Sequence, residues 1–344
     1  MATRALTDII NSLSSKFYDD ISNQINRSTP LLQVLEVKPG TEKNVQWDAR
    51  FGTAVPAGAH IADGADVTVF NSDDKVPAVL QYGTMHDAFA LTGKALDAAA
   101  ASGNPAQLAN LFMDDMNDSL ERIGAAVSDD MYNGTGATDH LVGLLNASGP
   151  LSATGTYAGI NRATYTQWAS NVVDYVAAAI DLDALRELRR VIYVASGKKP
   201  DLFVCDPATH AKIGSLYGQE RRYVQDVRVR GQVITLDGGY MALEFDGIPI
   251  IEDKGCAALK VLALNTREVF MSQLPSAGGV GAGMGNAMMQ ATPEYQFNAT
   301  QQKLSVKILP LAVTGNAFKF ALFIHPALVC RKPNTCGQLT NFTL

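Results

Sequence analysis

Residues 104–134, NPAQLANLFMDDMNDSLERIGAAVSDDMYNG, decide how this chain of 344 residues is organised. Asn104 is a typical N-cap residue, and Pro105 suits the first position of a helix. Apolar residues then recur at three- and four-residue steps as far as Met131, before Asn133-Gly134 ends the pattern. The spacing predicts a helix over about 105–133, roughly 44 Å long at about 1.5 Å per residue.

Two different patterns precede this helix. Apolar residues from Leu6 to Ile25 form one helical stripe, which predicts an amphipathic arm docked on its own or a neighbouring subunit. Alternating apolar residues at 45–51 and 76–82, with turn signals between them, predict a long, mostly antiparallel hairpin from about Asn44 to Thr92. Because an isolated hairpin is marginally stable in water, we expect it to rest on a partner, within or between chains.

Shorter elements follow the long helix. A helix is predicted over 183–195, ended by Gly197, and a second helix from Asp206-Pro207 to about Tyr217. The glycine-rich segment 278–285 is predicted to be a flexible loop. The expected strands lie at 201–205, 233–236, 242–245, 248–251, 260–264, 268–271, 303–313 and 317–324.

The composition excludes several classes of protein. Charged residues make up only 18%, below the roughly 25% of a typical domain, so we expect surface to be buried against other copies. The net charge of −6 excludes a basic nucleic-acid binder. The sequence contains no apolar run of about 18 residues, so we expect no membrane-spanning helix. The four cysteines do not make a disulfide scaffold, which indicates folding in a reducing cytoplasm.

A search for catalytic and binding motifs finds none. The five histidines are scattered, and the chain has no Cys-x-x-Cys, Gly-x-Ser-x-Gly or P-loop sequence. Adjacent aspartates such as Asp114-Asp115 do not face each other on a helix and indicate solvated surfaces. We therefore expect no enzyme activity and no catalytic, cofactor-binding or metal-binding residues. Cys330 and Cys336 could close a small disulfide loop, although a reducing compartment favours free thiols.

Four segments carry a resemblance to a known family. They are 143–145, 157–165 with Trp168, 200–207 and 245–253. In sequence, and in the order of arm, hairpin, long helix, α/β region, glycine loop and late strands, the chain resembles the HK97-like major capsid proteins of tailed double-stranded DNA bacteriophages.

The resemblance implies an α+β fold of the HK97-like capsid type. Its parts would be an N-terminal arm, an extended β-hairpin loop (the E-loop), a peripheral domain with a long spine helix, and an axial domain. The implied boundaries are 1–43 for the arm, 44–95 for the E-loop, 96–175 for the peripheral domain with its spine helix at about 105–133, 176–294 for the axial domain, and 295–344 for return strands of the peripheral domain and a C-terminal segment.

The implied function is self-assembly as hexamers and pentamers into an icosahedral head that encloses double-stranded DNA, with location in the virion after assembly in the host cytoplasm. The expected partners are further copies, a separate scaffolding protein, a portal and a decoration protein, with no membrane and no sequence-specific DNA contact. An acidic wall fits DNA driven into a preformed shell. Periodicity and position select the intersubunit contact candidates Leu6, Ile10, Phe17, Trp47, Phe51, Lys75, Tyr82, Arg221 and Arg222.

Alternatives remain at this point. The same fold could form an encapsulin-like compartment around enzymes, and an oligomeric α/β enzyme without a recognisable motif is a rival from another class. The arm-like stripe begins within ten residues of Met1, so either scaffolding is a separate protein or the chain is already processed. Lys75 lies in the E-loop, but because nothing in the sequence identifies its partners we expect no covalent crosslink between subunits.

Overall fold

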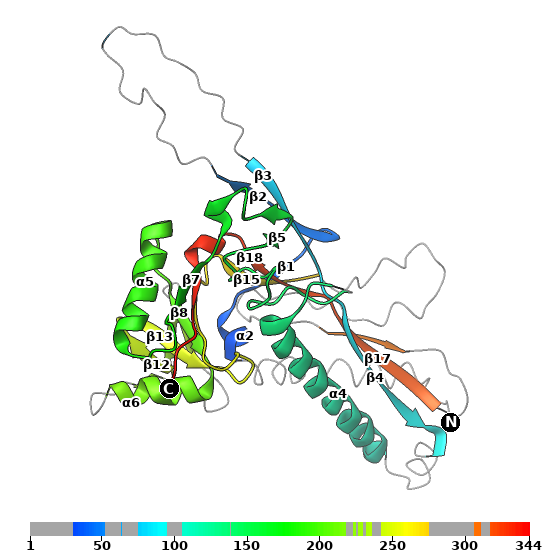
Figure 1. Ribbon diagram of the computed structural model, residues 1–344. Helices are drawn as coiled ribbons and strands as arrows, with labels where there is room; N and C mark the ends of the chain where they lie inside the picture. The colour runs from blue at the N-terminus through cyan, green and yellow to red at the C-terminus, as the bar shows by residue number, and fades with distance from the viewer. Residues whose placement is uncertain are drawn as a thin grey trace.

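In the computed structural model, a part built on a broad β-sheet lies beside a longer part built on one long helix (Figure 1). The structure describes residues 30–51, 63, 75–94, 105–137, 139–217, 223–224, 226–229, 232–235, 242–274, 306–310 and 317–344. Within these ranges, side chains are described except at 105–114, 223–235, 242, 307–310 and 318.

The broad sheet has seven strands in the order β7, β19, β14, β8, β13, β12, β9. In that order they span Asn171–Asp174, Gly337–Thr340, Val261–Leu264, Leu202–Cys205, Ile248–Glu252, Ala242–Phe245 and Tyr223–Val224. The β7–β19 and β8–β13 pairs are parallel and the others antiparallel. Strands β8 and β14 are buried at every residue, so their sequences are continuous apolar runs.

Two helices pack against this sheet, and both begin and end where the sequence predicts. Helix α5 spans Leu182–Ser196; the Asp181 side chain accepts from the Ala184 amide, and Gly197 ends the helix in the left-handed region. Helix α6 spans Pro207–Leu216, with Asp206 as its N-cap. Buried residues of α5, α6 and the sheet form a separate core that includes Leu188, Ile192, Phe203 and Ile213. A small hairpin pairs β10 (Asp226–Val229) with β11 (Gln232–Thr235).

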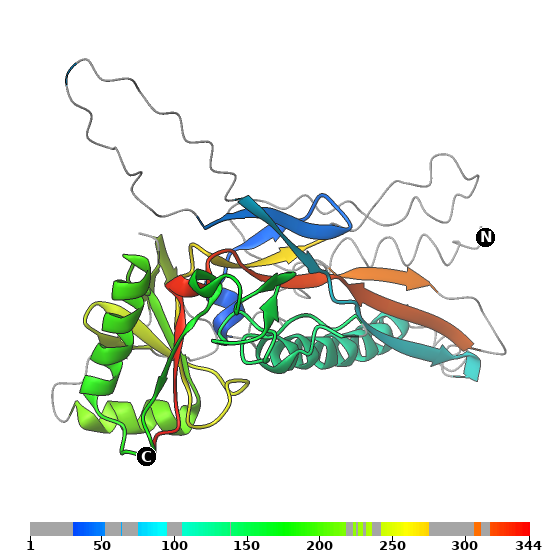
Figure 2. The same ribbon diagram turned by 45° about the horizontal axis from the view of Figure 1, so that its top comes forward.

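The long helix α4 spans Pro105–Asn133, as predicted. It packs along β4 (Met85–Thr92), which forms a sheet with β17 (Ala317–Ile324) and β16 (Lys307–Pro310). Figure 2 shows the helix lying beneath these strands.

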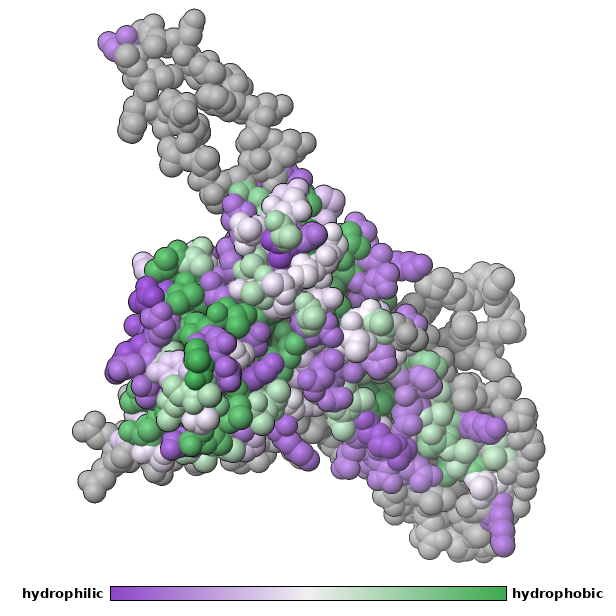
Figure 3. Space-filling view, in the orientation of Figure 1, coloured by the Kyte–Doolittle hydropathy of each residue, from purple (hydrophilic) through white to green (hydrophobic). Residues whose placement is uncertain are grey.

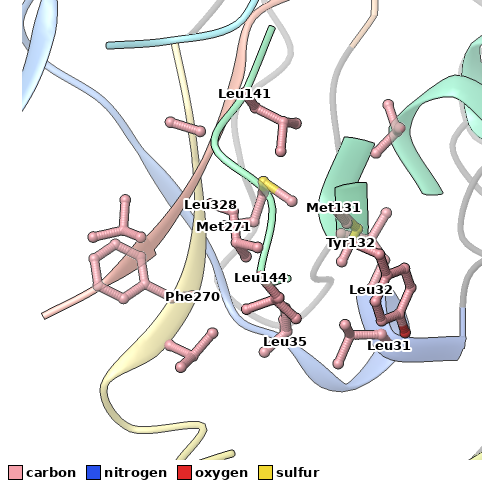
Figure 4. Close-up of a cluster of buried hydrophobic side chains, with 14 of the residues drawn as sticks. Leu31, Leu32, Leu35, Met131, Tyr132, Leu141, Leu144, Phe270, Met271 and Leu328 are labelled. Atoms are coloured by element: carbon pink, nitrogen blue, oxygen red, sulfur yellow. The ribbon is translucent and has the colours of Figure 1, made fainter. Parts of the chain in front are cut away.

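A third group of elements joins the two parts. Helix α2 (Pro30–Val34) leads into β1 (Val37–Pro39), which pairs with β15 (Val269–Gln273), and β15 pairs with β18 (Pro326–Cys330). Figure 4 shows their side chains meeting those from the end of α4 and the loop after it, including Leu31, Leu35, Met131, Leu144 and Met271. Elements distant in sequence thus share one core.

The predicted hairpin exists but is shorter than expected. Strands β2 (Asn44–Arg50) and β3 (Lys75–Gln81) pair antiparallel, with Asn44 opposite Gln81 and Arg50 opposite Lys75. The extension to Thr92 was wrong, because β4 pairs with β17 along its whole length. The chain leaves the hairpin at residues 82–84 and enters another sheet, a change of partner that alternation within one strand does not reveal.

Residues 134–170 cross the molecule between α4 and β7. This segment holds the two-residue strands β5 (Thr156–Tyr157) and β6 (Ile160–Asn161) and the short helix η1 (Thr166–Trp168). A further short helix, η2 (Pro333–Thr335), lies between β18 and β19. We call residues 156–168 the cross-segment, because the hairpin rests on it.

Other differences from the sequence predictions concern the C-terminal end. The strand predicted over 303–313 is Lys307–Pro310 in the described residues, and β18 and β19 were not foreseen. Strands β7 and β19 lie outside 176–294, so the sheet extends beyond the span predicted for the axial domain at both ends. The N-terminal arm and the loop at 278–285 lie outside the described residues.

Candidate assembly surfaces

The β2–β3 hairpin packs one face against the body of its own chain, and aromatic side chains lie beneath it. Phe51, just beyond β2, stacks on Tyr165 with ring centroids 4.5 Å apart and meets Trp168 edge-on at 5.7 Å. The ring centroid of Trp47 lies 6.5 Å from that of Trp168. We call these four rings the aromatic base; because stacked and edge-to-face aromatic pairs add stability beyond their buried area, they fix the hairpin on the body.

The cross-segment is itself held firmly. The Trp168 indole nitrogen donates to the Tyr157 carbonyl at 3.1 Å, and the Val79 amide of β3 donates to the Ala158 carbonyl at 2.9 Å. Arg162, only 2% exposed, donates to the carbonyls of Gly149 at 2.6 Å and Thr154 at 2.8 Å. Three neutral carbonyls, including that of Trp168, thus replace the water that this buried guanidinium loses.

The outer end of the described hairpin carries two opposed positive charges. Arg50 and Lys75 occupy directly opposite positions, and both are exposed. Like charges directly opposite one another destabilise a strand pair. An acidic group from another copy would offset the repulsion between these two side chains.

Tyr82, at the inner end of the hairpin, packs within its own chain. It is 9% exposed, and its hydroxyl lies 3.1 Å from the Ser272 hydroxyl on β15. A Cβ atom at Gly40 would come within 2.0 Å of the Tyr82 hydroxyl, so only glycine leaves room for this ring. Tyr82 anchors the hairpin to the central strands.

The root of the N-terminal arm is buried at the junction of the two parts. Leu31, Leu32 and Leu35 are fully buried, and Figure 4 shows them beside the end of α4. The Leu31 amide donates to the Asp253 carboxylate at 3.3 Å. Burial raises the pKa of Asp253, although hydrogen bonds from the amides of Gly255 and Leu31 oppose that rise. The point from which the arm departs is therefore fixed by contacts to the seven-stranded sheet.

A buried carboxylate ties the end of α5 to the central strands. The Glu268 side chain is 8% exposed and lies 3.0 Å from Lys198, 3.7 Å from Arg331 and 3.7 Å from Lys332. Burial alone would raise the pKa of Glu268, but the hydrogen bond from Lys198 and the charges of Lys332 and Arg331 leave it below its usual value. No sequence motif pointed to Glu268, because its partners come from two distant segments, at 198 and at 331–332.

The predicted contact residues are distributed unevenly. Trp47 and Phe51 meet at the aromatic base and Tyr82 lies inside, whereas Lys75 is exposed. Leu6, Ile10, Phe17, Arg221 and Arg222 lie outside the described residues. Sequence reasoning missed Tyr165 and Arg162 as supports of the hairpin; their only signal was their place in a segment that resembles capsid proteins.

The described residues contain no group of three or more His, Cys, Asp or Glu side chains able to hold a metal ion. All four cysteines are buried and free, and burial raises the pKa of Cys256 to about 12. A thiol with a pKa this high, such as that of Cys256, is a poor nucleophile. In the same part of the chain, no helix is long and apolar enough to span a membrane.

Solved structures of similar fold are shells. The capsid of cyanophage A-1(L) has a TM-score of 0.68, is 17% identical, and aligns over 92% of this chain and 93% of its own. A GTA particle capsid has a TM-score of 0.54 at 11% identity, covering 91% and 90%. The holo-SrpI encapsulin complex of Synechococcus elongatus PCC 7942 has a TM-score of 0.52 at 15% identity, covering 92% and 88%.

These likenesses confirm the α+β fold of HK97-like capsids. No curated protein sequence matches the chain. The family model described as SU10 major capsid protein matches residues 3–271 of the 344. Since that match spans well over half of the sequence, the chain belongs to the SU10 major capsid protein family, whose members form the capsid shell of the virion.

Proposed function

We propose that this capsid protein assembles as hexamers and pentamers into an icosahedral head that encloses double-stranded DNA. The observation that supports the proposal is the β2–β3 hairpin at the surface of the subunit: one face packs on the body of its own chain, and the other, which includes Arg50 and Lys75, is exposed. A two-stranded ribbon gains stability when its free face lies on a neighbouring copy. Its rigid aromatic base would present it to that neighbour at a constant angle.

The same proposal gives roles to the parts of the chain. Residues 1–43 serve as the arm, 44–95 as the E-loop, 96–175 as the peripheral domain, 176–294 as the axial domain and 295–344 as return strands and C-terminal segment. The axial domain also takes in β7 and β19, which complete its sheet. The exposed Lys75, opposite Arg50, contacts an acidic side chain of a neighbouring copy. Leu6, Ile10, Phe17, Arg221 and Arg222 are further contact candidates.

A separate scaffolding protein, a portal and a decoration protein are the proposed partners, and assembly takes place in the host cytoplasm. A shell wall of net charge −6 holds DNA by enclosure, because it lacks the excess of lysine and arginine that phosphate binding requires. The protein acts as a structural component, without enzyme activity.

A second candidate function is a compartment for enzymes. The likeness to an encapsulin over 92% of this chain favours it, since that fold also forms shells around cargo. The two functions differ in what the particle contains.

The test is sucrose-gradient sedimentation and negative-stain electron microscopy of cells expressing this chain with and without a candidate scaffold. The head function predicts shells or capsomer-like rings, and nuclease-resistant DNA inside particles recovered from infected cells. Particles that hold protein cargo instead of DNA would establish the compartment. If only a small uniform oligomer formed with the scaffold present, the capsid function would be contradicted.

A further inference from the structure

Three neighbouring strands of the seven-stranded sheet meet at one edge, and the backbone just beyond them has an unusual conformation. Strand register places the end of β7 beside the end of β19 and the start of β14. Just beyond these strands, Val176, Asn341 and Leu259 have φ angles of 49°, 57° and 57°. Glycine and asparagine visit this left-handed region readily, whereas a β-branched residue there is an outlier.

Hydrogen bonds hold the backbone at Val176 in this conformation. The Asp174 carboxylate accepts from the Val176 amide at 2.9 Å and from the Asn341 side-chain amide at 2.8 Å. The Ala177 amide donates to the Asn341 carbonyl at 2.6 Å. The strain is therefore fixed by the fold, and an asparagine at position 176 would satisfy the same backbone with less strain.

The side chains at this end of the sheet also face water. Val176 is 78% exposed, Leu259 is 39% exposed and the C-terminal Leu344 is 47% exposed. Leu344 belongs to the same end, because the Ile180 amide donates to the Thr343 carbonyl beside it. We call Val176, Leu259 and Leu344 the apolar sheet end. Figure 3 shows hydrophobic residues interrupting the hydrophilic surface around the C-terminus.

Contacts within the subunit do not explain these residue types. A strained, exposed valine gains neither local backbone energy nor burial from its own chain. Both costs are offset if the side chain is buried on assembly. We infer that the apolar sheet end is a contact surface for a second copy of this chain. The inference rests on the proposed shell assembly, which requires copies to bury surface against one another.

The sheet end is distinct from the hairpin. The hairpin lies on the core that contains the end of α4 and the central strands, whereas the sheet end belongs to the part with the separate core of α5, α6 and the sheet. A contact here therefore joins rigid bodies and depends on a few apolar side chains. Such contacts break when their central side chain becomes polar.

The test replaces Val176 with asparagine, Val176→Asn, alone and together with Leu259→Asn. Thermal unfolding of the dissociated subunit should be unchanged or shifted to higher temperature, because the left-handed backbone suits asparagine. Self-association, followed by sedimentation velocity over a concentration series, should require at least about tenfold more protein than wild type, as expected for the loss of a buried aliphatic side chain.

Asp139→Asn is the matched control. Asp139 is an exposed residue with a φ of 64°, so the substitution places asparagine in the same backbone conformation away from the sheet end. Its unfolding temperature and its self-association should both match wild type.

Each outcome of these measurements supports or overturns the inferred contact. Normal self-association of both Val176→Asn and the double variant would overturn the inference while leaving the capsid function intact. A sharp fall in unfolding temperature for Val176→Asn would show that the valine serves its own fold, and would also overturn it. If wild type did not self-associate with or without scaffold, the capsid function and the inference would fall together.

Discussion

The seven-stranded sheet and the β2–β3 hairpin are both β-structure, yet they gain stability in opposite ways. Strands β8 and β14 are buried at every residue between a helical layer and the central strands. The hairpin alternates between more buried and exposed residues, and its Trp47 and Phe51 pack on Tyr165 and Trp168. The sheet is complete within one subunit, whereas we propose that a neighbouring copy covers the exposed face of the hairpin.

This difference suits a chain that is both a stable subunit and an assembling one. Residues that maintain the subunit lie in the closed cores, and we propose that residues that direct assembly lie at the surface. Substitutions in the sheet should therefore mainly lower the stability of the subunit, and substitutions in the hairpin should mainly weaken assembly.

The largest effect on the subunit is expected from Phe203→Ala. Phe203 is fully buried on β8 and lies edge-on to Phe245 at 6.3 Å. Removing its ring should lower the free energy of unfolding by about 3–5 kcal/mol. Urea unfolding of the dissociated subunit measures this. Val194→Ala, at a position 72% exposed on α5, is the control and should change little; equal effects would contradict the closed core.

A smaller loss is expected from Glu268→Gln, which leaves Lys198, Arg331 and Lys332 without their shared carboxylate. The free energy of unfolding should fall by about 2 kcal/mol near neutral pH. Glu187→Gln, which alters an exposed pair with Arg190, should have no measurable effect.

The stabilisation that the Glu268 carboxylate provides should depend on pH. The pKa of Glu268 lies below its model-compound value of 4.5 in the folded chain, so its stabilisation is present above that pH and is lost as the pH falls through the folded pKa. Unfolding curves from pH 7 down to about 3 should show wild type and Glu268→Gln converging at the acid end. A constant gap between them would contradict the assigned role.

Phe51→Ala should cost the subunit only about 1 kcal/mol, since its ring is partly exposed. Its effect on assembly should be larger, because the hairpin loses its fixed direction. The chain contains two tryptophans: Trp168 lies edge-on to Phe51, and Trp47 lies beside Trp168. Their fluorescence should shift to longer wavelength as the aromatic base opens to water; an unchanged spectrum with normal particles would show that Phe51 is dispensable.

Lys75→Glu should have the smallest effect on the subunit. Placing a glutamate opposite Arg50 replaces a like-charge pair by an opposite-charge pair, which should stabilise by about 0.5 kcal/mol or less. Assembly should nevertheless weaken if an acidic neighbour faces position 75. Gradient sedimentation of particles at two salt concentrations measures the loss, and Lys75→Gln separates loss of the contact from repulsion.

Local features of the sequence predicted much of this fold. Gly197 and the Asp206-Pro207 pair predicted helix ends to within one residue, and regular spacing predicted α4 residue for residue, whereas the N-cap Asp181 was not foreseen. Pairing between distant segments could not be read in the same way. Strand β4 alternates like a hairpin strand but pairs with β17 more than 200 residues away, and β19 joins β7 and β14 although it contains a glycine.

The supports of the candidate assembly surfaces were harder to predict. Aromatic residues on β2 stood out by alternation, but the rings that receive them lie more than 110 residues later. Glu268 and Asp253 are single acidic residues within ordinary stretches, and their importance arises from partners that the fold brings together. The left-handed backbone at Val176 has no sequence signal, because valine is the residue type least expected there.

A cryo-electron microscopy map of wild-type particles that resolves side chains is the most direct test. It would show whether the seven-stranded sheet is complete within one subunit while the hairpin is completed by its neighbour. We predict that the exposed face of the β2–β3 ribbon lies on an adjacent copy, with Trp47 and Phe51 still packed on Tyr165 and Trp168 of their own chain. A hairpin folded back on its own subunit, without contact to another copy, would contradict it.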